Sequence, residues 1–277
     1  WGALLPAVNA KGAGAGEDDG VVFPRASDGR RGTLEIGRAV FADALRVTSP
    51  TAAAAAEQER DWRHRYIVHA RHLTEATLAS ASVAQDSAVA GLNSARERLR
   101  FVRDGSETLL DAAMAAPRAP FSTRSFVGIS TSGPAPLAVP LHGQLLTGDA
   151  LRRQLDRWLD DGLFELSFAA AIARVQTHPE WLDLSDQRIA LLGAHAEMSP
   201  LPWLLQWRAT VYAVDLPRQA IWHRLLRLAH DGNGTLVAPF RVDPGPDATA
   251  DELTRQAGAD LIVDTPEIAE WLAAADG

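Results

Sequence analysis

The residues best suited to chemistry, by type and spacing, lie between positions 188 and 216. An aliphatic run, RIALL, is followed by Gly193, and a second apolar run, TVYAV, is followed by Asp215 about 20 residues later. A glycine at the end of a strand lets the backbone approach a phosphate or carboxylate, and an acid at this spacing can accept hydrogen bonds from ribose hydroxyls. The pattern therefore predicts a nucleotide-type cofactor site at the turn after the first run.

The predicted site draws on three segments of the chain. A further apolar run, ADLIVD, predicts another strand, and ligands of parallel sheets bind outside the carboxyl ends of the strands. Histidine titrates near neutrality, so His142 and His195 are weak candidates for a general acid or base, with polar loop residues as the alternative interpretation. The predicted cofactor-binding residues are Gly193, Ala194, His195, Ala196, Glu197, Met198, Asp215, Leu216, Asp264 and Thr265. Helix capping is the alternative role for Thr265.

These residues need a sheet to position them, and the sequence predicts one. The order from position 188 is strand, turn, helix, strand, followed by an amphipathic helix and the strand GTLVAPF. The run RIALL has no polar alternation, which is typical of a parallel strand covered on both faces. We therefore predict an α/β fold, with a parallel sheet in the C-terminal part and a mainly helical N-terminal part.

The segment from Gly193 to Asp215 resembles the Rossmann-fold superfamily, over roughly the last third of the chain. Of the G-x-G-x-x-G/A fingerprint, only Gly193 matches. The resemblance implies a Rossmann-like sheet that binds NAD(P) and serves an oxidoreductase with a small-molecule substrate. S-adenosylmethionine and a methyltransferase are the alternative, because that cofactor carries no phosphate for Glu197 to repel. A non-enzymatic nucleotide-binding or scaffold protein is the second alternative.

The N-terminal part has a helical pattern and no chemical motif. From Thr51 to about Arg103, apolar residues recur at helical spacing, and Val89 and Leu92 belong to a stripe that we expect to be buried. Packing within the chain or a homo-oligomer interface would bury such stripes. A helix is expected over 106–116. The predicted organisation is a partly flexible segment 1–50, a mainly helical region with connector 51–143, and a cofactor-binding domain 144–277 that is truncated if the chain is a fragment.

Composition excludes several other classes of function. The formal charge is −8, so we expect no nucleic-acid partner and no anionic membrane surface. The chain has no cysteine, which excludes disulfides and thiolate chemistry, and arginines crowd the histidines around position 69, so we predict no metal site. No apolar run approaches the roughly 20 residues of a membrane-spanning helix. We therefore expect a soluble, cytoplasmic protein. The glycine-rich residues 9–20 predict a linker rather than a phosphate loop.

Overall fold

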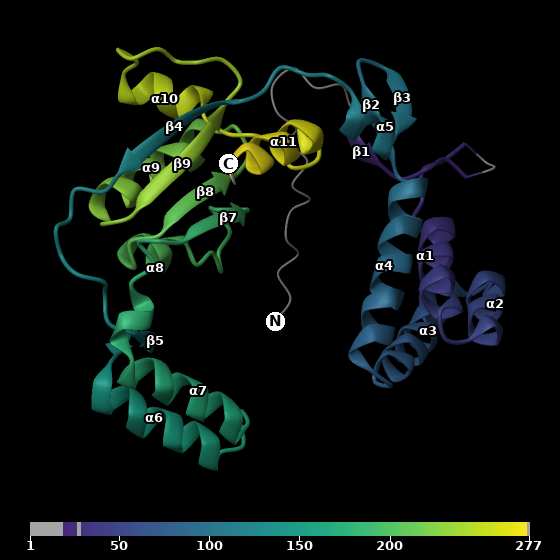
Figure 1. Cartoon of the computed structure of the whole chain (residues 1–277), viewed down its shortest axis with the longest axis horizontal. Coiled ribbons are helices and arrows are strands. Elements are labelled where there is room, and N and C mark those ends of the chain that lie inside the picture. Colours follow the sequence, from purple (N-terminus) through teal and green to yellow (C-terminus); the bar gives the residue numbers. More distant parts are fainter. Residues whose placement is uncertain (1–18, 27–28, 276–277) are drawn as a thin grey trace. The chain divides into compact units, whose positions relative to one another are not determined.

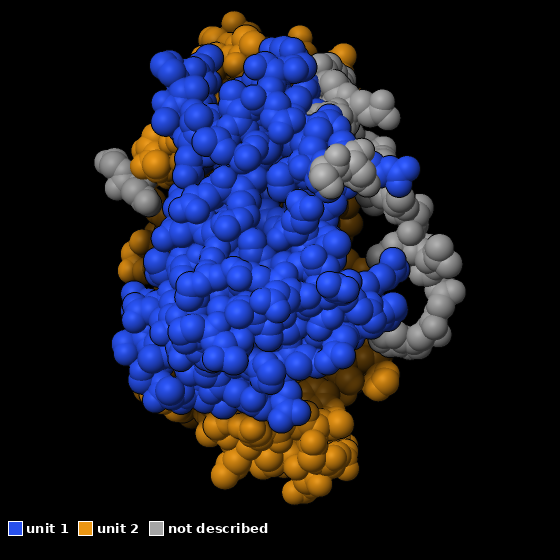
Figure 2. All heavy atoms as spheres, turned by 90° about the vertical axis from the view of Figure 1, so that its right-hand side faces the viewer, with its two compact units in different colours: residues 1–119, 262–266 blue, residues 120–261, 267–277 orange. Residues whose placement is uncertain are grey.

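The computed structural model describes residues 19–26 and 29–275, which form two compact units. Unit 1 contains the residues up to 119 together with 262–266, and unit 2 contains 120–261 and the residues from 267 onward; Figure 2 colours them separately. The boundary therefore lies at position 119, whereas the sequence analysis placed it at 143, because the expected connector supplies a strand to the sheet of unit 2. Almost all of the predicted linker 9–20 lies outside the described residues.

Unit 1 is built mainly from helices. The first of them falls within the segment 1–50 that was expected to be partly flexible, and its residues Ala42 and Leu45 are buried against Ala53 and Ala56 of the next helix. Ser49 caps that second helix, since its Oγ accepts a hydrogen bond from Ala52 N at 3.2 Å. The helices are α1 (Leu34–Arg46), α2 (Pro50–Gln58), α3 (Trp62–Thr77), α4 (Ala81–Arg98) and α5 (Leu110–Ala115) (Figure 1).

Helix α4 is oriented differently from the prediction. Val89 and Leu92, expected to be buried, are 49% and 57% exposed, whereas the small residues Ser87, Gly91 and Ser94 are buried. The reason is a close approach to α1: a Cβ atom added to Gly91 would lie 3.4 Å from the Ala44 Cβ. Bulky side chains cannot occupy that face, so Val89 and Leu92 lie on the exposed side of the helix.

A three-stranded antiparallel sheet completes unit 1. It contains β1 (Gly20–Val22), β2 (Arg100–Arg103) and β3 (Ser106–Leu109), in that order. The predicted helix over 106–116 is therefore only half correct, because its first residues form β3. Residues 262–266 return to this unit: Val21 N donates to Ile262 O at 2.9 Å, and Arg103 donates to Val263 O at 3.0 Å.

A mixed four-stranded sheet lies at the centre of unit 2. Its order is β4-β9-β8-β7, in which β7, β8 and β9 are parallel and β4 pairs with β9 in the antiparallel direction. The strands are β4 (Ser122–Val127), β7 (Arg188–Leu192), β8 (Thr210–Val214) and β9 (Thr235–Phe240). The parallel strands predicted from the sequence are thus confirmed, and their connections are helices.

Helices cover both faces of this sheet. On one face, α8 (Leu201–Gln206) and α9 (Gln219–Asp231) bury leucines such as Leu205 and Leu225 against β8 and β9, with α10 (Ala250–Gln256) beside them. On the other face lies α11 (Thr265–Ala275), whose Trp271 packs with Val214 and Phe121. Figure 1 shows β7, β8, β9 and these helices in green to yellow, and β4 in teal.

Two sequence predictions about the sheet are wrong. The run ADLIVD is not a strand: after an isolated bridge between Ala257 and Phe240, residues 258–264 form irregular backbone and turns. Strand β7 is covered on one face only, since Leu192 is 55% exposed and Arg188 and Ala190 are also exposed. An edge strand with one open face carries the same aliphatic sequence as a buried strand.

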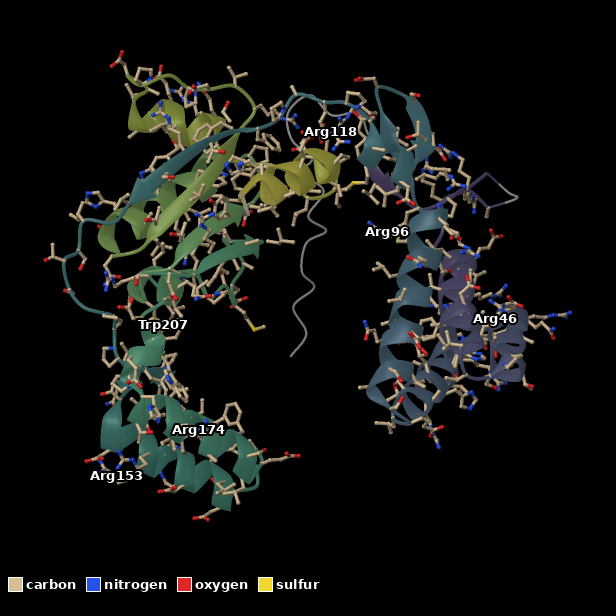
Figure 3. The ribbon with its side chains drawn as sticks, viewed as in Figure 1. Arg46, Arg96, Arg118, Arg153, Arg174 and Trp207 are labelled. Atoms are coloured by element: carbon tan, nitrogen blue, oxygen red, sulfur yellow. The ribbon has the colours of Figure 1, made fainter. Side chains whose placement is uncertain are left out.

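The rest of unit 2 is a hairpin and a helix pair. Strands β5 (Val139–Leu141) and β6 (Gln144–Leu146) precede α6 (Gly148–Asp160), α7 (Leu166–Thr177) and a 3-10 turn, η1 (Pro179–Leu182). Leu151 and Leu155 form the inner face of α6, as the sequence predicts. The connector after β4 contacts the carboxyl end of α8, because Trp207 Nε1 donates to Ala135 O at 2.9 Å; Figure 3 labels Trp207.

Candidate functional site at the carboxyl edge of the sheet

The turn after β7 is held by the neighbouring strand. Gly193 N and Ala194 N both donate to Val214 O, at 2.8 and 3.2 Å, and Ala196 N closes the turn on Gly193 O at 3.0 Å. Gly193 has a φ of +80°, which side-chain-bearing residues rarely adopt, and an added Cβ would meet only the Ala196 Cβ at 4.0 Å. The backbone at Gly193 is therefore open to a ligand.

Asp215 joins the two strand ends. Its Oδ2 accepts a hydrogen bond from His195 N at 2.6 Å, and its Oδ1 accepts one from Leu216 N at 2.8 Å. A carboxylate offers roughly four acceptor positions, so about two remain after these backbone bonds. The predicted residues of the first two segments therefore lie together, and Asp215 has both a structural role and free acceptor capacity.

A segment that the sequence analysis did not assign to the site also lies at the end of β8. Ala259 N donates to Asp215 O at 2.9 Å, and Trp222 Nε1 donates to Leu216 O at 3.1 Å. Gly258 has a φ of +115°, and a Cβ there would lie 2.4 Å from Trp222 Nε1. A single glycine after a helix was the only sequence signal for this close approach.

Helix α8 contributes little to anion binding. It is six residues long, and its first amides already have acceptors: Leu201 N donates to Ser199 Oγ at 3.2 Å, and Leu204 N to Pro200 O at 3.0 Å. Glu197 and Met198 are exposed in the turn that precedes it, and Met198 is 94% exposed. The turn thus presents a carboxylate and few unused N–H groups where a dinucleotide would place its phosphates.

Three predicted residues have other positions. Asp264 and Thr265 do not follow a strand of the sheet, because the predicted fourth strand is absent there. Asp264 is buried. Thr265 Oγ1 donates to Ile262 O at 3.2 Å at the start of α11. His142 and Gly143 form the two-residue turn between β5 and β6, with φ values of +47° and +78°. That geometry explains His142 as an exposed turn residue.

Two cavities lined by described residues lie on the sheet face next to α11. The larger, about 310 Å³, has aromatic walls, including Tyr212 and Trp271, whose rings are 5.5 Å apart. Trp271 Nε1 donates to Thr123 Oγ1 at 2.8 Å at its border. The smaller, about 250 Å³, is lined by Arg188 and Ala190 of β7. Neither includes a residue of the predicted cofactor turn.

Comparison with protein-family models, with curated proteins and with solved structures found no match. Within the described residues, no group of histidines and carboxylates is arranged to hold a metal ion. The helices of residues 19–26 and 29–275 include none that is long and apolar enough to cross a membrane.

Proposed function

We propose that unit 2 binds a nucleoside-containing cofactor at the carboxyl ends of β7 and β8, and that this cofactor is NAD(P) serving an oxidoreductase reaction on a small-molecule substrate. The observation that carries the proposal is Asp215: its carboxylate lies at the end of β8, bonded to the turn after β7, with about two acceptor positions left for ribose hydroxyls. Open backbone at Gly193 beside it leaves room for the ligand.

S-adenosylmethionine is the second candidate, and a specific observation favours it. The exposed Glu197 and the occupied amides of α8 disfavour a pyrophosphate, whereas the ammonium group of S-adenosylmethionine would be attracted by Glu197. Both cofactors present a ribose to Asp215. The chemistry, hydride transfer or methyl transfer, then depends on which of them the turn accepts.

Titration calorimetry with NAD⁺, NADP⁺ and S-adenosylmethionine tests the shared part of the proposal. Asp215→Asn keeps one oxygen for the His195 amide and loses the charge and the acceptor for the Leu216 amide. We expect it to weaken binding of the preferred cofactor about tenfold or more, equivalent to 1.4 kcal/mol. Asp186→Asn, the same substitution at an exposed position before β7, is the control and should bind normally. Equal binding by Asp215→Asn, or no binding of any cofactor to folded wild-type protein, would refute the site.

Glu197→Gln separates the two cofactors by the direction of its effect. Removing this negative charge should tighten the binding of NAD(P), because the phosphates lose a repulsive neighbour. The same variant should bind S-adenosylmethionine more weakly, since the ammonium group loses an attractive one. Glu165→Gln, an exposed glutamate next to α7, controls for the general change in net charge.

A further inference from the structure

Strand β7 has an open backbone edge among the described residues, because its one neighbour in the sheet is β8. Gln187 O accepts from Thr210 N at 3.0 Å and Gly193 N donates to Val214 O at 2.8 Å, so the odd-numbered residues of this segment bond to β8. Alternate residues of a strand direct their amides to opposite sides. The N–H and C=O groups of Arg188, Ala190 and Leu192 therefore point away from the sheet.

This edge lacks the features that normally protect one. Natural edge strands carry proline, bulges or several charges that prevent another strand from pairing. β7 has none of these except Arg188 at its first position, and its exposed side chains include Leu192 at 55%. An exposed apolar strand with unused hydrogen-bonding groups is a template for a further strand.

We propose that β7 pairs with β7 of a second copy of this chain, antiparallel and across a two-fold axis at Ala190. A strand edge is complementary to itself in this arrangement, and the register that sets Arg188 opposite the second copy's Leu192 gives about six hydrogen bonds. Two four-stranded sheets then become one continuous sheet. The pairing does not depend on the proposed cofactor.

Antiparallel pairing separates the charges on β7 and keeps its exposed side chains on one face. In that register the two Arg188 side chains lie at opposite ends, four residues or about 13 Å apart along the strand, where salt screens them. Parallel pairing of the same edge would need a two-fold axis along the strand, which would put the Ala190 and Leu192 side chains of the two copies on opposite faces of the sheet. In the antiparallel arrangement the exposed side chains of Ala190 and Leu192 from the two copies would lie next to one another on the same face.

The test is a pair of charge variants at one position, measured by analytical ultracentrifugation of the full chain. We expect wild-type protein to dimerise. Leu192→Lys places a lysine opposite Arg188 of the other copy, twice because of the symmetry, and should raise the dissociation constant about tenfold. Leu192→Glu places an acid there and should dimerise as well as wild type or better. Weakening by both variants alike would contradict the register.

A matched control uses the same substitution elsewhere. Leu92→Lys on α4 changes a leucine of similar exposure, 57%, and should leave the dimer intact. If Leu92→Lys dissociates the dimer and Leu192→Lys does not, the copies meet through the N-terminal helices and the proposal is wrong. We expect a dimer dissociation constant no higher than about 20 µM. A wild-type chain that stays monomeric at about 200 µM, ten times that value, would overturn the proposal as well.

A second measurement examines the backbone itself. Ala190→Pro removes an N–H that points to the open edge, so it leaves the pairing with β8 intact, and it should abolish the dimer. Hydrogen exchange on the wild type gives the same information without a variant. The amides of Arg188, Ala190 and Leu192 should become protected as protein concentration rises, and equal exchange at low and high concentration would overturn the proposal.

Discussion

Gly258→Ala should disrupt the end of β8 that carries Asp215. The substitution forces an alanine into a φ of +115°, which costs about 1–3 kcal/mol in such sparsely populated regions. Its Cβ would lie 2.4 Å from Trp222 Nε1 and 2.9 Å from Asp215 O, so the surrounding backbone must move, at a further cost of about 1–3 kcal/mol. The free energy of unfolding should therefore fall by about 2–6 kcal/mol.

Urea unfolding followed by circular dichroism measures this loss, and Gly245→Ala is its matched control. Gly245 also has a positive φ, +76°, but an added Cβ meets nothing within 4 Å, so its cost is limited to about 1–2 kcal/mol of backbone strain. The difference between the two variants isolates the close approach to Trp222 and Asp215. If Gly258→Ala and Gly245→Ala destabilise equally, the argument from packing at β8 is refuted.

Three further predictions concern single side chains. Leu225→Ala should lower the free energy of unfolding by about 2–5 kcal/mol, because Leu225 is 1% exposed. Leu145→Ala, at a position that is 62% exposed, should lower it by less than about 0.5 kcal/mol. Urea titration measures both. The Arg31 guanidinium, 2.7 Å from Glu107, lowers the pKa of that carboxyl. This ion pair therefore stabilises the folded state above the ordinary pKa of 4.5, and the stabilisation is lost as pH falls through the lowered pKa. The free energy of unfolding of Glu107→Gln should fall less than that of wild type over this acidic range. His142→Asn should leave the melting temperature and any activity unchanged, since asparagine accepts a positive φ, and lost activity would restore His142 as a catalytic candidate.

The local pattern of aliphatic and turn-forming residues predicted the parallel strands of unit 2. The runs 188–192 and 210–214 are short, aliphatic and bounded by turn residues, and the helices between the strands have clear periodicity. The same pattern placed Gly193 and Asp215 at neighbouring strand ends, which the hydrogen bond between His195 and Asp215 confirms as a contact.

The errors arise where tertiary contacts override local pattern. The run 259–264 has the composition of a strand, but Gly258 directs it across the end of β8 and its last residues belong to unit 1. In α4 the spacing of Val89 and Leu92 is helical, yet the side that packs is decided by how closely α1 approaches Gly91. The periodicity of a segment does not contain information about these contacts with other parts of the chain.

The return of residues 262–266 to unit 1 has a consequence for the order of events during translation. Ile262 O accepts from Val21 N, and a Cβ on Gly20 would lie 2.6 Å from the same carbonyl oxygen, so β1 packs against a segment that is made after residues 120–261 of unit 2. At 5–20 residues per second, a ribosome needs about 7–30 s to proceed from the end of the first part of unit 1 to that segment. The packing of β1 on this segment therefore has to wait until the strands of the unit 2 sheet have been synthesised.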